Sequence, residues 1–361
     1  MNSTSNTDVL ELDRSKPFLC IILEFSHYTA GDRINGEVLM NLPDSLSESN
    51  LIMYSSGSEF LHVVTKHKKA VKYNNEIFHV DTTLKVWEYE TPKSQYNFPF
   101  TFKLPYFAPA TLSVRTQDNE GNLLEASIVY EIKVVLEIKG KILLQDTIPL
   151  LIFNNKTRCP IPPSVSETEL STCFCFKKGH CNISLSQTNN HHPNYGDTAK
   201  FKLELDWFNN KGQITEVYGK VLYKLQLSIP GDKTYEFTID LCEFKHANSF
   251  FTEANSIQTN YEFDVSLYGD FGDNVSSNAT AMINSSYIGE ATVVFNLGVT
   301  NRIAKATLPV HINPKVSENR NLIVPSDWEA SACSLLSIYL QSKTGHPIFS
   351  PTKTSIALVR E

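Results

Sequence analysis

The stretch Glu131-Ile132-Lys133-Val134-Val135-Leu136-Glu137-Ile138-Lys139 decides the fold of this 361-residue chain. Apolar side chains occupy every second position of it, namely Ile132, Val134, Leu136 and Ile138. Charged side chains occupy most of the positions between them. A period of two is typical of a β-strand that packs one face on a core and turns the other to water. Strands of this kind belong to antiparallel sheets.

The same alternation recurs along the chain, in the segments 33–40, 200–206, 221–229, 235–241 and 261–267. Polar loops separate these segments, and hardly any helical pattern occurs before residue 325. Many half-buried strands joined by short polar loops indicate β-sandwiches. We therefore predict an all-β protein.

The amino-acid composition and charge disfavour some classes of function. Hydrophobic residues make up 41% and charged residues 20% of the chain, which suits a globular protein. The 32 Lys and Arg against 39 Asp and Glu give a net charge of −7, which disfavours a nucleic-acid partner. We find neither a signal peptide nor an apolar run long enough to span a membrane. The expected location is the cytoplasm, including the periphery of plasma or endosomal membranes.

Two signatures occur twice. Gly31-Asp32 opens one alternating segment and Gly196-Asp197 opens another. Ile148-Pro149 and Leu308-Pro309 lie in the last segment of each half, and proline in a strand indicates an edge position. We therefore predict two related sandwiches. The expected boundaries are a flexible N-terminus 1–17, a first domain 18–153, a proline-containing linker 154–170, a second domain 171–315 and a tail 316–361.

The tail changes character. Ser326-Asp327-Trp328-Glu329 has the form of a helix capping box, and apolar residues follow at helical spacing. The pattern predicts a helix over 327–341. Either the segment packs back on a sandwich as a helix or strand, or its apolar stripe binds a partner.

Several motifs resemble the arrestin superfamily. They are Tyr28-Thr29-Ala30-Gly31-Asp32-Arg33-Ile34-Asn35-Gly36-Glu37-Val38, Gly57-Ser58-Glu59, Phe98-Pro99-Phe100-Thr101-Phe102-Lys103-Leu104-Pro105 with the later Pro109, and Tyr130-Glu131-Ile132-Lys133-Val134. Only Ser26-His27 separates Phe25 from Tyr28, and this compactness is closest to the α-arrestin, or arrestin-domain-containing, adaptors. The resemblance implies two tandem arrestin-like immunoglobulin-type β-sandwich domains with a short C-terminal tail.

The resemblance also implies a function, that of a non-enzymatic adaptor or scaffold in endocytic or endosomal sorting. Its expected partners are cytoplasmic segments of membrane proteins and trafficking machinery, with transient contact to anionic membrane. The Pro-Pro-x-Tyr motif that recruits ubiquitin ligases is missing, because Pro162-Pro163 is followed by Ser164-Val165. Two alternatives remain open: a retromer-like coat subunit with an arrestin fold, and a secreted β-sandwich adhesion protein glycosylated at sequons such as Asn278 or Asn284.

The motif search favours no enzyme. The chain has no nucleophile elbow, phosphate loop, dinucleotide fingerprint or zincin helix. Asp270-Phe271-Gly272 has the letters of a kinase motif without its other elements, and we interpret it as a turn in a polar loop, 269–286. We predict no catalytic residue, no cofactor and no metal.

One basic stretch interrupts the acidic chain. It consists of His62, Lys66, His67, Lys68, Lys69 and Lys72. The stretch is either a solvated loop or a contact with acidic lipid headgroups or phosphorylated cargo. We take it as the candidate site.

A second cluster contains three of the seven cysteines, Cys173, Cys175 and Cys181, beside His180. Their spacing does not match the turn-borne cysteine pairs of structural zinc sites. Three interpretations stay open: an apolar strand edge, exposed thiols for acylation, and metal binding.

Overall fold

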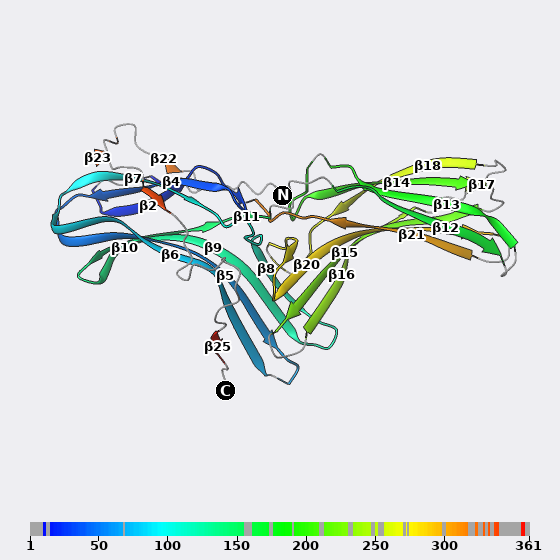
Figure 1. Ribbon diagram of the computed structural model, residues 1–361, viewed down its shortest axis with the longest axis horizontal. Coiled ribbons are helices and arrows are strands. Elements are labelled where there is room, and N and C mark those ends of the chain that lie inside the picture. Colours follow the sequence, from blue (N-terminus) through cyan, green and yellow to red (C-terminus); the bar gives the residue numbers. More distant parts are fainter. Residues whose placement is uncertain are drawn as a thin grey trace.

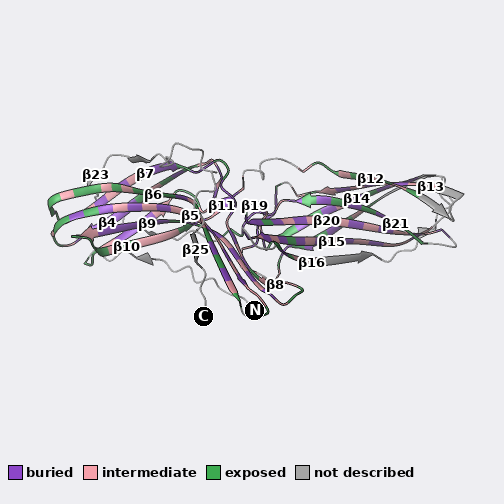
Figure 2. Ribbon diagram, turned by 60° about the horizontal axis from the view of Figure 1, so that its bottom comes forward, coloured by how far each residue is buried: buried purple, intermediate pink, exposed green. Residues whose placement is uncertain are grey.

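The computed structural model describes residues 10–11, 15–67, 69–154, 161–172, 176–189, 191–208, 213–229, 234–246, 250–251, 256–269, 272, 274–297, 301–316, 322–323, 328, 331–332, 336–338 and 355–357. Every regular element in these residues is a β-strand, and the long strands pair antiparallel, whereas the parallel pairings involve strands of two or three residues. The all-β prediction is confirmed. Figure 2 shows the alternation that accounts for these strands: buried positions alternate with more exposed ones along β5 and β20, for example.

The amino-terminal half, strands β2 to β11, forms two principal sheets. One has the order β2-β4-β7, and the other has the order β10-β9-β5-β6 with β8 paired to β9. The strands are β2 (Phe18–Leu23), β3 (Tyr28–Thr29), β4 (Arg33–Leu42), β5 (Leu46–Val64), β6 (Ala70–Thr91), β7 (Ser94–Lys103), β8 (Leu112–Gln117), β9 (Leu123–Ile138), β10 (Lys141–Leu150) and β11 (Ile152–Phe153).

The carboxy-terminal half, strands β12 to β21, also forms two sheets. One has the order β12-β13-β14-β18, and the other has the order β16-β15-β20 with β17, β19 and β21 on its flanks. The strands are β12 (Ser164–Thr172), β13 (Phe176–Gln187), β14 (Thr198–Phe208), β15 (Gln213–Ser228), β16 (Thr234–His246), β17 (Phe250–Phe251), β18 (Ser256–Ser266), β19 (Asn278–Ala279), β20 (Ile283–Asn296) and β21 (Asn301–Val310).

The two halves have matching strand orders and lie end to end (Figure 1). β4 pairs with β2 and β7, as β14 pairs with β13 and β18. The long strand β9 pairs with β5, β8 and β10, as β20 pairs with β15, β19 and β21. Pro149 and Pro309 lie on the flanking strands β10 and β21, where the missing amide proton costs no ladder bond.

The Gly-Asp signature forms the same turn in both halves. Gly31 and Gly196 have φ angles of 88° and 94°, which only glycine adopts without strain. Asp32 Oδ2 accepts the Thr29 amide at 2.7 Å, and Asp197 Oδ2 accepts the Asn194 amide at 2.9 Å. The Asp32 carbonyl then accepts the Leu104 amide at 2.9 Å, just as the Asp197 carbonyl accepts the Leu267 amide at 3.0 Å. The Gly-Asp motif that occurs twice in the sequence therefore forms the same turn twice in the structure.

The phenylalanine run of β7 fills the amino-terminal core. Phe98, Phe100 and Phe102 are each at most 4% exposed. The opposite position, Lys103, is exposed. Gly36 on β4 leaves room for the Phe100 ring, since a Cβ there would lie 2.5 Å from Phe100 Cζ. The three phenylalanines therefore form the inward face of β7.

Two local predictions need correction. The expected linker 154–170 contains the first residues of β12, which pairs antiparallel with β13 and covers an edge of that sheet that would otherwise be unpaired. The expected helix 327–341 contains two strands instead, β23 (Ser331–Ala332) and β24 (Leu336–Ile338), and both run parallel to β7. A free sheet edge offers main-chain partners that outweigh a weak helical pattern.

The remaining short strands also involve the chain ends. β1 (Leu10–Glu11) pairs with β22 (Leu322–Ile323), and β25 (Ser355–Ala357) pairs with β6. Trp328 contacts Phe18 of β2, with ring centroids 5.6 Å apart. Described parts of the tail therefore pack back on the amino-terminal half, one of the two outcomes that the sequence left open.

Candidate functional site

The basic stretch lies at the tip of the hairpin formed by β5 and β6, which projects from the body (Figure 1). The Thr65 amide donates to the Lys69 carbonyl at 3.0 Å and closes the turn. Four of the predicted residues are exposed, namely Lys66, His67, Lys69 and Lys72. Lys68 lies outside the described residues. We call the segment from Lys66 to Lys72 the basic tip.

His62 differs from the rest of the predicted site. It faces Glu125 on β9, and its Nδ1 lies 2.7 Å from Glu125 Oε2. Glu125 also binds Arg115 Nε at 3.0 Å. The imidazole is thus held in a cross-strand network several residues before the turn, and only 18% of its side chain is exposed. His62 is therefore placed apart from the basic tip.

Acidic groups lie beside the basic tip, on the turn between β8 and β9. Asn122 Oδ1 accepts the Lys66 amide at 3.1 Å and joins the two turns. Asp118 accepts bonds from the Glu120 and Asn122 amides, at 2.9 and 2.8 Å. Asn122 Nδ2 also donates to Asp118 Oδ2 at 2.7 Å, so this carboxylate is joined to the basic tip through one side chain and confines the positive potential to the tip itself.

A second site lies where the two halves meet. Asn278 on β19 is 4% exposed, and its side chain bonds the backbone of Ala110 twice: Oδ1 accepts the Ala110 amide at 2.7 Å and Nδ2 donates to the Ala110 carbonyl at 3.0 Å. Ser276 Oγ donates to the Thr111 carbonyl at 2.7 Å. We call this contact between residues 110–113 and 274–280 the junction.

Backbone pairing extends the junction. The Ser113 amide donates to the Asn274 carbonyl at 2.7 Å, as an isolated antiparallel bridge between the halves. Gly272 packs so closely that a Cβ there would lie 2.4 Å from the Ser113 carbonyl oxygen. Residues 272 and 274–280, which lie within the polar loop predicted over 269–286, therefore supply this contact from the carboxy-terminal half.

Glu59 on β5 is a buried carboxyl at the junction, and it is 2% exposed. Thr280 donates its hydroxyl proton to Glu59 Oε1, and Asn75 Nδ2 donates to Glu59 Oε2 at 3.3 Å. Burial raises the pKa of the Glu59 carboxyl above its usual range, and the hydrogen bonds offset part of that effect.

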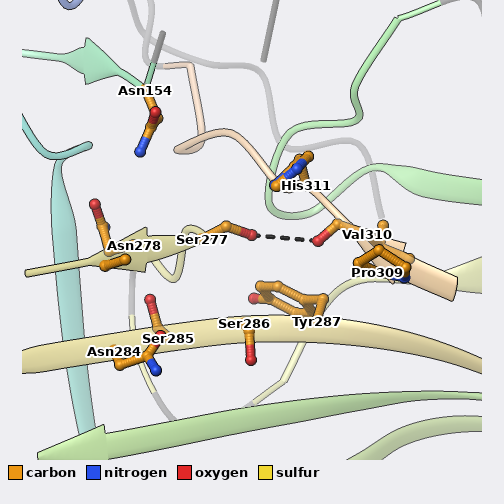
Figure 3. A pocket seen from close by; sticks show the side chains of 11 residues that line it. Asn154, Ser277, Asn278, Asn284, Ser285, Ser286, Tyr287, Pro309, Val310 and His311 are labelled. Carbon is orange, nitrogen blue, oxygen red and sulfur yellow. Dashed lines mark hydrogen bonds between the residues drawn. The ribbon is translucent and has the colours of Figure 1, made fainter. Parts of the chain in front are cut away.

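A cavity of about 150 Å³ lies beside Asn278 (Figure 3). Asn154 points into it from the end of the amino-terminal half, opposite the β20 residues that follow Asn284. Ser277 Oγ accepts the Ile312 amide at 3.0 Å, and the Tyr287 hydroxyl donates to the Val275 carbonyl at 2.9 Å. These lining groups already have partners within the fold, so the cavity is poorly equipped to recognise a ligand.

The cysteine cluster is only partly described, since Cys173 and Cys175 lie outside the described residues. Cys181 is fully buried on β13, and burial together with Asp206 raises the pKa of its thiol to about 12. A buried neutral thiol is a poor nucleophile and a poor metal ligand. Within the described ranges, no group of three His, Cys, Asp or Glu side chains is placed to hold a metal ion.

No protein-family model matches the chain, and no curated protein matches it. Among the described residues, no helix is long and apolar enough to cross a membrane. Sequence reasoning identified the basic tip but missed Glu59, Asn278 and Thr280 as junction residues. For Glu59 the sequence does contain a signal, since an acidic residue occupies a position on the apolar face of an alternating strand. Asn278 and Thr280 gave none.

Proposed function

We propose that this chain is a non-enzymatic arrestin-like adaptor or scaffold that sorts membrane proteins in endocytic or endosomal transport. In this proposal each half is one arrestin-like immunoglobulin-type β-sandwich domain. Its partners are cytoplasmic segments of membrane proteins and trafficking machinery, and it acts in the cytoplasm at the periphery of plasma or endosomal membranes.

One observation carries the proposal: both halves repeat one strand order and one Gly-Asp turn, and they dock directly through the junction. The arrestin-like motifs occupy structural positions in this arrangement. The run from Phe98 to Pro105 forms β7 and its exit, and Glu59 of the Gly-Ser-Glu motif reaches the junction. A family resemblance built on residues with such specific contacts supports the assignment more than shared fold class does.

The mechanism we propose is binding by sheet edges and by the basic tip. On the edge strand β2, the Ile21 amide is capped by Asp146 Oδ2 at 2.9 Å. β12 lies at the end of its sheet, and Val165 on it is 70% exposed. An extended cargo segment would therefore add more readily to β12 than to β2, while the basic tip contacts acidic groups at the membrane.

The proposal is tested by proximity labelling with the full chain in its native host cell. We expect enrichment of membrane proteins with cytoplasmic segments and of trafficking proteins. The chain with Lys66, Lys68, Lys69 and Lys72 changed to Ser serves as the matched control and should lose the membrane-associated part of that set. Enrichment of nucleic-acid or metabolic proteins alone would contradict the proposal.

The two alternatives predict other outcomes. A retromer-like coat subunit would co-purify with a stable partner in fixed stoichiometry, whereas an adaptor would lose its cargo on dilution. A secreted adhesion protein would carry glycans, but Asn278 is buried with both amide atoms bonded to Ala110. Peptide mass analysis of Asn278 and the exposed Asn284 separates this case, and glycan on the native protein would favour secretion.

A further inference from the structure

Glu59 couples the two halves through an ionisable group. Its own half supplies Asn75 as a donor. The other half supplies the Thr280 hydroxyl and the Ile283 backbone amide, which both favour the ionised carboxylate. Thr280 lies on Oε1, so separating the halves would uncover this carboxyl oxygen.

The groups that face Glu59 provide no compensating positive charge. On β6 the neighbour is the neutral Asn75, and on the junction segment it is Thr280. On β9 it is Tyr130, whose hydroxyl donates to the Pro109 carbonyl at 2.7 Å and whose pKa burial raises well above 10. Within the described part of the chain, no lysine, arginine or histidine forms an ion pair with Glu59. An ionised carboxylate is therefore costly in the docked arrangement.

The hydrogen bond to Thr280 can survive protonation. When Glu59 is ionised, Thr280 donates to it. When Glu59 is protonated on Oε2, Oε1 remains a carbonyl oxygen and still accepts the Thr280 hydroxyl. Thr280 Oγ1 itself already accepts the Met282 and Ile283 amides, at 3.2 and 2.8 Å, so Thr280 stays the donor in both states. The contact is kept in both states, and only the cost of burying the charge differs.

We infer that Glu59 makes the docking of the two halves pH-dependent, so that protonation of its carboxyl tightens the junction and ionisation loosens it. This goes beyond the proposed adaptor function and does not require it. The inference rests on the placement of a buried, uncompensated carboxyl across the contact between the halves.

The sign follows from linkage. Docking acts on the Glu59 carboxyl in two ways: burial raises its pKa, and the bonds from Thr280 and Ile283 lower it. Burial is the larger effect, so the pKa in the docked form lies above the ordinary value of 4.5, toward which it falls when water reaches the carboxyl in an open form. The docked form then binds more protons. Proton binding stabilises the docked form relative to the open form. This stabilisation is fully present below the pKa of the open form and is lost as pH rises through the pKa of the docked form. Each unit by which the Glu59 pKa of the docked form exceeds that of the open form changes the docking equilibrium by about tenfold.

Amide hydrogen exchange in the full chain measures docking without a label. The amides of Ala110 and Ser113 donate across the junction. The amides of Leu104 and Leu267 donate within one half each and serve as internal controls. We expect protection factors at Ala110 and Ser113, corrected for intrinsic exchange, to rise as pH falls from 8 to 4, by up to about tenfold for each unit by which the docked pKa exceeds the open one. The controls should stay constant.

Three variants separate charge from structure. Glu59→Gln removes the titration and should make junction protection independent of pH. Thr280→Val removes a donor that favours the carboxylate, so the transition should move to higher pH. Glu131→Gln changes an exposed carboxyl on β9 and should leave the wild-type profile unchanged.

The inference is wrong if wild-type protection at Ala110 and Ser113 does not change with pH, or changes in parallel with the control amides. It is also wrong if Glu59→Gln retains the pH profile. Should Glu59→Gln fail to fold, the direction of the Thr280→Val shift decides: a transition that stays in place or moves to lower pH overturns the inference.

Discussion

The side chain of Asn278 pairs with Ala110 as a neighbouring strand would, accepting from its amide at 2.7 Å and donating to its carbonyl at 3.0 Å. The two residues are 168 positions apart in the chain. Asn278 and Ala110 are both buried, so the backbone amide and carbonyl of Ala110 cannot form hydrogen bonds with water instead. One primary amide thus satisfies a donor and an acceptor at the centre of the junction.

Asn278→Ala should weaken the junction. The change leaves the buried amide and carbonyl of Ala110 without this partner, at about 1–3 kcal/mol for each unsatisfied group. Urea unfolding measures the loss, and exchange at the Ala110 amide should become faster. Asn284→Ala, at an exposed position of the same segment, is the control. Equal stability of the two variants would show that the Asn278 contact contributes little.

Phe100→Ala should destabilise the amino-terminal half by about 3–5 kcal/mol, because the ring is 1% exposed and its removal leaves a cavity. Phe107→Ala is the matched control, since that ring is 65% exposed and should cost less than about 1 kcal/mol. Chemical denaturation of both variants gives the comparison. A loss below about 1 kcal/mol for Phe100→Ala would contradict the burial of this strand face.

Gly36→Ala should cost about 1–3 kcal/mol through overpacking. The new Cβ would lie 2.5 Å from Phe100 Cζ and 2.7 Å from the Ile22 carbonyl oxygen. Part of the clash is with a side chain, so adding Phe100→Leu should make the Gly36→Ala change less harmful than it is alone. A double-mutant cycle by thermal unfolding measures this coupling. Strictly additive effects would refute the close contact between the two residues.

Cys181 should resist alkylation in the folded protein. Burial holds its thiol pKa at about 12, so almost no thiolate exists at pH 8, and reactivity should rise only as pH approaches 12 or the chain unfolds. Iodoacetamide labelling with peptide mass analysis, in buffer and in urea, checks this. Labelling in native buffer at the rate of a free peptide thiol would argue against burial and would revive the acylation hypothesis for this residue.

The basic tip should bind anionic vesicles weakly. Each of its four lysines contributes on the order of 1 kcal/mol near an anionic surface, about 3–4 kcal/mol together. Flotation should require anionic lipid and should weaken as salt rises. Changing Lys66, Lys68, Lys69 and Lys72 to Ser should abolish it.

A second quadruple variant controls for net charge, with the exposed Lys85, Lys93, Lys141 and Lys315 changed to Ser. It should still float. If both variants behave alike, general charge rather than the tip explains the binding. If the parent chain does not float, the basic tip is ordinary solvated surface, which Asp118 and Glu120 beside it would help to explain.

The sequence by itself indicated the buried face of the strands in which apolar and polar residues alternate, because alternation is a local property that such a strand carries in its own residues. Phe100 inward and Lys103 outward agree with this alternation. The flanking positions of Pro149 and Pro309 were indicated separately, because proline has no amide proton for a ladder bond. The duplicated Gly-Asp turn was equally readable, since its bonds close within a few residues.

Only the tertiary structure decided where the halves touch. Glu59 meets Thr280 across 221 positions of sequence, and no local pattern records a partner that distant. Cross-strand register placed His62 opposite Glu125 rather than with the lysines. In the tail, pairing with the edge of β7 formed strands where the spacing of apolar residues predicted a helix. Period and turn chemistry act over a few residues, whereas junction contacts depend on how completed sheets pack against each other.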